Sequence, residues 1–304
     1  MGGLILRRLL GIVPLLVVVS LLTFLLLRAA PGSPFDADRN FPEEIRKNIE
    51  RKFKLDQPWY AQYTSYMGGL VSGDLPSLKR PGFTIWELIS ESFPHSLLLG
   101  TLALGFALLF GLTLGVISGV RQNTAVDHAS MSFALIGISV PNFVLGPLLI
   151  LLFSLYLGWF PPARWEGIRT MVLPAVTLGL VYAAYIARLG RAGMLDVIRQ
   201  DFVRTARAKG LSEGVVVRRH ALRGGILPVV TFLGPAAARI LTGTLVVERI
   251  FQVPGMGYYF VQSALDRDHT MVLGAIVFYA TFLMVLNLAV DVAYGFLDPR
   301  VRHA

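Results

Sequence analysis

The sequence contains no cysteine, which excludes disulfide bonds, thiol catalysis and thiolate metal sites. Charged residues are also scarce: they make up 15% of the 304 residues, where a soluble domain usually carries about 25%. Hydrophobic residues make up 54% and gather in long runs. This composition indicates an integral membrane protein and argues against a soluble enzyme.

Motifs that carry chemistry are missing too. There is no Gly-x-x-x-x-Gly-Lys-Ser/Thr phosphate loop, so we do not expect the chain to hydrolyse a nucleotide itself. No His-Glu-x-x-His metal motif occurs either. The five histidines are scattered: His95, His128, His220, His269 and His303. We therefore expect no catalytic residue, no metal site and no bound cofactor.

The hydrophobic runs predict an all-α membrane protein with about six transmembrane helices. Each run is long enough to cross about 30 Å of hydrocarbon. None alternates apolar and polar residues as a barrel strand does, which leaves helices. The first run is longer than a signal-peptide core of about 7–15 residues, which favours a retained helix over a cleaved signal. The predicted spans are 9–27, 93–119, 129–157, 171–189, 226–247 and 271–297.

The basic residues predict how the chain is oriented. Residues 188–223 hold nine Arg and Lys residues against three acidic ones. Such an excess marks a cytoplasmic loop. With six spans both termini are then cytoplasmic, in agreement with Arg7 and Arg8 at one end and Arg300 and Arg302 at the other.

The 28–92 segment is predicted to be a small extracytoplasmic group of short helices. Glu43 and Glu44 after a proline favour a helix start, and Gly68 and Gly69 favour an end. Between them large apolar residues recur at four-residue spacing, at Leu55, Trp59, Tyr63 and Met67. The segment either covers the spans or receives a partner protein.

These patterns divide the chain into four parts. Residues 1–27 form the first transmembrane helix, and 28–92 form the extracytoplasmic segment. Residues 93–297 form a core of five helices that includes the cytoplasmic loop 190–225, and 298–304 form a cytoplasmic tail. Within the core, Gly111, Gly115 and Gly119 form a stripe that lets two helices pack closely or, alternatively, slide as a gate.

The cytoplasmic loop contains a short predicted helix. Asp201 is a candidate N-cap, and Gly210 is a natural residue just past the C-terminus. Thr205, Ala206 and Ala208 are small, so the helix backbone can approach another surface closely. Such a helix either inserts into a groove on a partner protein or lies on anionic lipid head groups.

The same loop carries a family resemblance. The stretch 204–228, RTARAKGLSEGVVVRRHALRGGILP, resembles the cytoplasmic coupling motif of ABC importer permeases. Further stretches resemble the dipeptide and oligopeptide branch of that family: LDQPWYAQY (55–63), SGDL (72–75), SVPNF (139–143), VVERIFQVPGMG (246–257), RDH (267–269) and LDPR (297–300). The sequence departs from the family pattern at Pro76, His95 and Gly224.

The resemblance implies a type I ABC importer permease in the bacterial cytoplasmic membrane. It implies a second, homologous permease, two cytoplasmic ATPases that bind ATP and Mg²⁺, and an extracytoplasmic substrate-binding protein; nucleic acid is not an expected partner. The implied function is inward transport of di- or oligopeptides by alternating access, although nickel complexes and sugars are also substrates of the branch. The implied coupling residues are Arg204, Thr205, Ala206, Arg207, Ala208, Lys209, Gly210 and Leu211.

Two other functions remain open from the residues alone, namely a proton- or sodium-driven secondary transporter and a membrane scaffold. Four residues are candidates for the translocation path, because prolines break helices and polar groups are costly in lipid: Pro141, Asn142, Pro235 and Arg239. Arg239, predicted near the middle of a span, either attracts a substrate carboxylate or has a structural role, paired with an acid on another subunit or directed towards the membrane surface.

Overall fold

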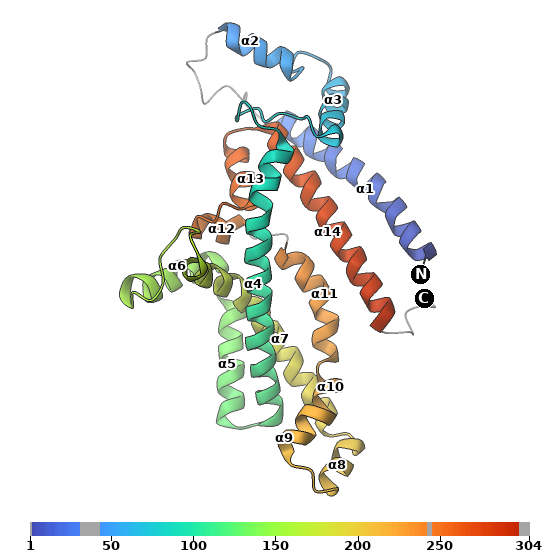
Figure 1. Ribbon diagram of the computed structural model, residues 1–304, viewed down its shortest axis with the longest axis vertical. Helices are drawn as coiled ribbons and strands as arrows, with labels where there is room; N and C mark the ends of the chain where they lie inside the picture. Colours follow the sequence, from blue (N-terminus) through green and yellow to red (C-terminus); the bar gives the residue numbers. More distant parts are fainter. Residues whose placement is uncertain (1, 31–42, 242–244, 298–304) are drawn as a thin grey trace. The chain divides into compact units, whose positions relative to one another are not determined.

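The structure, a computed structural model, describes residues 2–30, 43–241 and 245–297. These residues are helical with short connections, and the only β-type pairing within them is an isolated bridge between Pro76 and Thr84. The contacts divide the chain into two compact units. We call 1–96 with 254–304 the terminal unit, and 97–253 the central unit. Figure 1 shows the helices of both.

The terminal unit is built on α1 (Gly2–Ala29) and α14 (His269–Leu297), which pack side by side (Figure 1). Its other helices are α2 (Glu43–Lys52), α3 (Trp59–Ser72), the first turns of α4 (Ile85–Val120) and α13 (Met256–Leu265). Phe24, Tyr66 and Ile85 belong to its buried core together with Met271 and Leu273. The core therefore joins α1 and α14 to the helices of the 28–92 segment.

Two helix ends of the terminal unit differ from the predictions. Gly68 and Gly69 do not end α3, which continues to Ser72 and stops at Gly73, a left-handed residue with φ of 90°. The α4 helix begins at Ile85, ahead of the predicted start of a span at 93. Thr84 and Glu87 explain this start, because each accepts a hydrogen bond from the other's backbone N–H, at 3.2 and 2.7 Å.

The central unit is built around α7 (Ile168–Ile198), a helix with buried residues along most of its length. The rest of α4, α5 (Ala125–Ser139) and α6 (Asn142–Leu149) precede it, with a π-helical turn, η1, at Ile150–Tyr156. After it come α8 (Asp201–Ala208), α9 (Glu213–Val215), the π-helical η2 (Val216–Ala221), α10 (Leu222–Gly225), α11 (Leu227–Leu241) and α12 (Leu245–Phe251).

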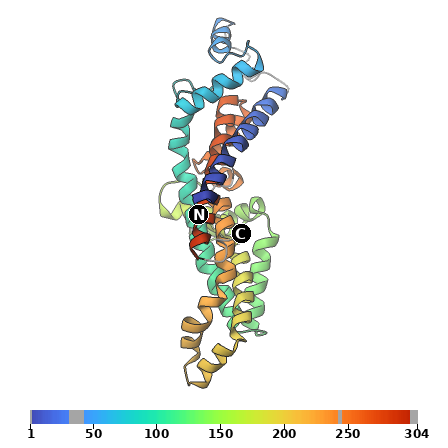
Figure 2. The same cartoon turned by 90° about the vertical axis from the view of Figure 1, so that its right-hand side faces the viewer.

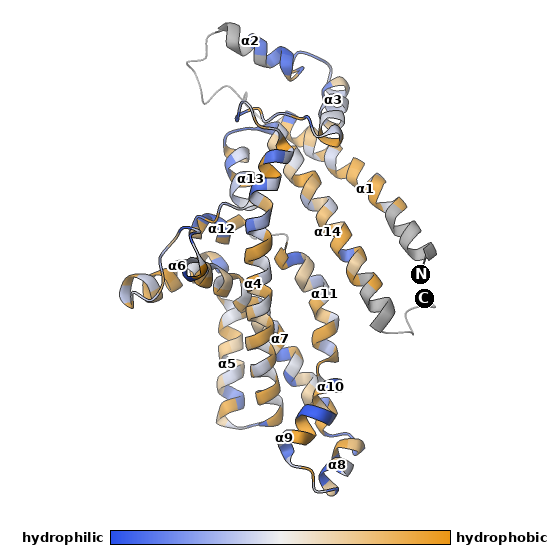
Figure 3. Ribbon diagram, in the orientation of Figure 1, coloured by the Kyte–Doolittle hydropathy of each residue, from blue (hydrophilic) through white to orange (hydrophobic). Residues whose placement is uncertain are grey.

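The predicted number of spans agrees with the structure. Among the described residues, four helices are long and apolar enough to cross a membrane: α1, α4, α7 and α14. Two bent pairs raise the number to six if each pair is counted as one span, and Figure 3 shows the apolar residues that dominate these helices. One pair runs from α5 into α6 and η1 with a bend of 112°, and the other from α9 to α11 with a bend of 51°.

The predicted third span, 129–157, is therefore not one straight helix. The break lies between Ser139 and Asn142, where Val140 is extended, with φ of −91° and ψ of 117°. Pro141 causes it, because a proline has no backbone N–H and disfavours a helical residue before it. The predicted fifth span, 226–247, contains α11 and the start of α12, and residues 242–244 between them lie outside the described ranges.

The glycine stripe of α4 packs against α7. A Cβ atom on Gly111 would lie 2.5 Å from the carbonyl oxygen of Ala183, and one on Gly115 would lie 2.6 Å from that of Ala187. A Cβ atom on Gly119 would lie 2.6 Å from Cβ of Met194. Only glycine permits this approach, so the stripe is a close helix–helix contact, as predicted for packing.

Candidate functional site: the α8 loop and the broken spans

The α8 helix follows a tight connection from α7. Its N-cap is Gln200, which makes no side-chain capping bond, so the prediction of an Asp201 cap is wrong. Asp201 instead occupies the first helical turn and pairs with Arg204 at 3.4 Å. The predicted C-terminal end is confirmed: Gly210 has φ of 77°, a left-handed conformation that favours glycine.

One face of α8 is buried inside the central unit. Val203 is completely buried and Ala206 is 4% exposed. Both belong to a cluster with Met194 and Val197 of α7 and Val216 of η2. Ala206, expected to help α8 approach another protein, therefore faces inward and anchors the helix.

The opposite face of α8 is open. Its side chains are exposed together with those of the following turn: Phe202, Arg204, Thr205, Arg207, Ala208, Lys209 and Leu211. Two of them are large apolar residues: Phe202 is 46% and Leu211 38% exposed. Arg207 donates two hydrogen bonds to Glu213 of α9, at 2.7 and 3.3 Å. Figures 1 and 2 show α8 and α9 beyond the end of α7, so this face projects from the central unit.

The candidate path residues lie on two helices that both pack against α7. Pro141 is the exposed N-cap of α6. Asn142 follows it and is half-buried, and its Oδ1 atom is buried without a hydrogen-bond partner among the described residues. Pro235 is exposed within α11, and the helix continues through it from Leu227 to Leu241.

Arg239 lies in α11, close to residues 242–244, which are outside the described part of the chain, so its predicted depth within a span stays a prediction. The residue is exposed, and Tyr182 of α7 is within its electrostatic reach.

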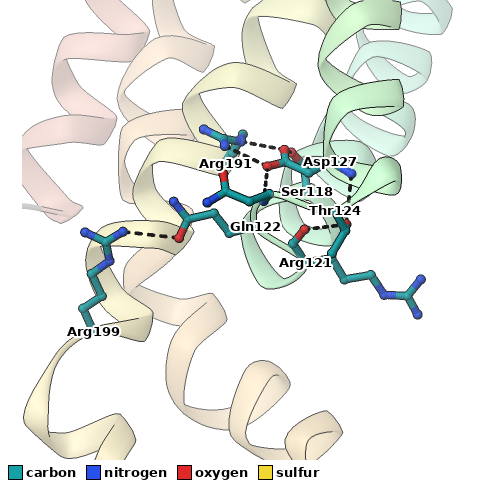
Figure 4. A network of polar contacts seen from close by, with 8 residues as sticks. Ser118, Arg121, Gln122, Thr124, Asp127, Arg191 and Arg199 are labelled. Atoms are coloured by element: carbon teal, nitrogen blue, oxygen red, sulfur yellow. Dashed lines mark hydrogen bonds and ion pairs between the residues drawn. The ribbon is translucent and has the colours of Figure 1, made fainter.

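One polar cluster, drawn in Figure 4, was not predicted from the sequence. Asp127 of α5 is 1% exposed and accepts two hydrogen bonds from Arg191 of α7, at 2.7 and 2.8 Å. Ser118 of α4 and the backbone N–H of Asn123 donate to the same carboxylate. A local signal was present: Thr124 caps α5 and Asp127 stands three residues later, a pattern typical of helix starts. Its partner on α7 had no such signal.

No group of three or more His, Asp or Glu side chains within the described ranges is placed to hold a metal ion. The site therefore consists of a projecting amphipathic helix, a buried ion pair beside it and two broken spans. Such a combination is that of a polytopic α-helical membrane protein.

The comparisons with known proteins identify the class of this protein. Residues 111–303 match the family described as "Binding-protein-dependent transport system inner membrane component", and residues 1–99 match its N-terminal companion family. The chain belongs to this family. It is a permease subunit of an ABC importer: a transport component, and itself a multi-pass inner membrane protein.

Curated relatives match over almost the whole chain. The oligopeptide transport system permease protein OppB of Haemophilus influenzae is 42% identical over 98% of this chain and 99% of its own length. The dipeptide transport system permease protein DppB of Bacillus subtilis is 43% identical over 99% of this chain and 98% of its own length. The family places the chain in a complex with other ABC transporter components, and none of these matches points to a proton- or sodium-driven transporter.

Solved structures show the same fold at low sequence identity. An amino acid ABC transporter aligns with a TM-score of 0.53 and 17% identity, over 70% of this chain and 94% of its own. The MetNI methionine ABC transporter, in an inward-facing conformation, aligns with a TM-score of 0.52 and 18% identity, over 70% and 95%. These alignments establish the type I ABC importer permease fold for this chain.

Proposed function

We propose that this chain forms one half of a pore that moves di- or oligopeptides inward by alternating access. A second, homologous permease supplies the other half, two cytoplasmic ATPases drive the cycle, and an extracytoplasmic binding protein delivers the substrate. The observation that carries this proposal is α8, a short helix with one face anchored in the central unit and the other exposed.

Helix α8 is suited to transmit force because it does not stand alone. A helix of eight residues is unstable by itself in water. Here the burial of Val203 and Ala206 and the Arg207–Glu213 pair hold it against η2 and α9. A partner that grips the exposed face therefore displaces the elements behind it instead of unfolding the helix.

We assign the coupling role to the exposed residues of α8 and of the turn that follows it. Phe202 and Leu211 offer apolar contacts to a groove, and Arg204, Arg207 and Lys209 offer charge. Ala206 contributes as an internal anchor. Gly210 fixes the direction in which the chain leaves the helix, because its left-handed conformation turns the backbone.

The peptide substrate is proposed from the relatives, whose names are those of oligopeptide and dipeptide transport permeases. Arg239, Pro141, Asn142 and Pro235 are the proposed path residues, and a cation suits the carboxylate end of a peptide. We further propose that ATP and Mg²⁺ bind only to the ATPase subunits and that this chain holds no cofactor. Both termini and α8 face the cytoplasm in this arrangement, and the 28–92 segment lies outside.

Cross-linking tests the proposed docking surface. The chain has no cysteine, so a single one can be introduced at Thr205 on the exposed face of α8. A short bifunctional reagent should join this cysteine to an ATPase in the complex purified in mild detergent. Thr64, an exposed threonine of α3, supplies the matched control and should give no such product. Cross-linking at Thr64, or a chain that purifies without ATPases, would contradict the proposal.

A further inference from the structure

The carboxylate of Asp127 collects donors from three separate segments of the central unit. Arg191 of α7 contributes two, Ser118 of α4 contributes one, and the backbone N–H of Asn123 in the α4–α5 turn contributes another. The Asp127 side chain is 2% exposed and that of Arg191 is 28% exposed. Figure 4 shows both side chains meeting between α5 and α7, so one buried group ties three segments together.

A charge-assisted pair of this kind resists separation. Arg191 meets Asp127 through Nε and Nη2, a bidentate arrangement that fixes orientation as well as distance. The carboxylate is removed from water, so pulling Arg191 away leaves a buried charge without its main partner. The α4–α5 turn and α7 therefore behave as one body at this level.

This body continues into the base of α8. Met194, three residues after Arg191, packs with Val203 and Ala206 of α8 in the same buried cluster. A second tie lies further along: Arg199 at the α7–α8 junction donates a hydrogen bond of 3.2 Å to Gln122 of the turn. The second tie is exposed, so water competes with it, and the Asp127–Arg191 pair is the stronger of the two.

We propose that Asp127 and Arg191 are positioning residues that transmit displacement of α8 to α4 and α5. The inference rests on the proposed coupling role of α8. When an ATPase moves α8, the pair makes the α4–α5 turn move with the end of α7. The movement then passes along α5 towards its break at Pro141. Without the pair, only apolar packing and the exposed Arg199–Gln122 bond hold the end of α7 to the α4–α5 turn, so the two are displaced together less completely.

The test measures transmission directly in the full complex. Ala129 of α5 and Asp201 of α8 are both exposed. Spin labels on cysteines at these two positions measure the distance between α5 and α8. In the otherwise unchanged chain this distance should be the same in nucleotide-free and ATP-trapped complexes. In Asp127→Asn it should change with nucleotide, while stimulation of ATP hydrolysis by the binding protein falls about tenfold, within the usual range of coupling effects.

Two further variants keep the outcome decisive. Arg121→Gln removes a cation from the same turn, but its side chain points away from the carboxylate, so it should behave as the unchanged chain (Figure 4). Arg191→Lys keeps the charge and loses the bidentate geometry, so its stimulation should be intermediate; it decides the question if Asp127→Asn does not assemble.

A constant label distance and normal stimulation in Asp127→Asn or Arg191→Lys would overturn the inference. Failure of the proposed function gives a different result, since Thr205→Cys would then not cross-link to an ATPase even in the chain with an intact pair.

Discussion

Asp268, immediately before α14, accepts a hydrogen bond of 2.5 Å from the hydroxyl of Ser77, 191 residues earlier in the chain. The same buried carboxylate accepts bonds from the backbone N–H groups of Leu78, Lys79 and Met271. It thus caps α14 and holds the loop after α3 against it. Within the terminal unit, this one side chain joins the 28–92 segment to a membrane-spanning helix.

Replacing that carboxylate should loosen the loop. Asp268→Asn removes the charge and leaves donors without their acceptor, which costs about 1–3 kcal/mol for an unsatisfied buried group. We expect a lower Tm in detergent and faster proteolysis between Gly73 and Phe83. Asp266→Asn is the control, since within the described ranges the Asp266 carboxylate bonds to Gln262 in the preceding turn. Equal Tm values for the two variants would show that Asp268 does not hold the loop.

The glycine stripe predicts a contrast within α4. A Cβ atom on Gly115 would meet the backbone of Ala187, whereas one on Gly105 would meet nothing within 4 Å. Gly115→Ala should therefore push α4 from α7 and destabilise the protein by about 1–3 kcal/mol, the usual range for overpacking. Gly105→Ala, in the same helix, should be neutral or slightly stabilising in thermal unfolding. If both variants unfold alike, the close contact does not contribute to stability.

The conformation of Gly210 predicts a defect in coupling. A β-branched residue is strained at φ of 77°, although space around its Cβ is open. Gly210→Val should shift the end of α8 and reduce peptide uptake with little loss of protein from the membrane. Gly210→Asn, which tolerates the left-handed region, should retain most uptake. Normal uptake by the valine variant would mean that the direction of the chain after α8 is unimportant.

The proposed orientation is open to labelling. Ser72 of α3 and Ser212, just before α9, are both exposed, and the chain contains no cysteine of its own. Each serine can therefore be replaced by a single cysteine for labelling. On intact cells an impermeant maleimide should label Ser72→Cys alone, because the basic loop is expected in the cytoplasm. Both should react after the membrane is permeabilised. Labelling of Ser212→Cys alone on intact cells would reverse the topology.

The role of Arg239 is tested with paired substrates. If its guanidinium attracts a carboxylate in the path, Arg239→Gln should reduce uptake of a peptide more than uptake of its C-terminal amide. Arg239→Lys should restore part of the difference, since it keeps the charge. Equal losses for both substrates would favour a structural role for the cation instead.

Much of the architecture could be predicted from the sequence because the relevant forces are local. The apolar runs required helices, since lipid offers backbone groups no hydrogen-bond partners. Pro141 broke its span, and Gly210 ended α8, because each acts on its own backbone angles. The charge excess in 188–223 likewise needs no structure to be recognised, and the orientation that follows from it remains a prediction.

Tertiary structure alone decided which side chains meet. Arg191 and Asp127 are 64 residues apart, and no periodicity within either helix indicates that they pair. The sequence shows that Ala206 has a small side chain, but only the packing of α8 on Met194 and Val197 shows that this side chain faces inward. Hydropathy and capping act over a few residues, whereas these outcomes depend on how distant helices pack.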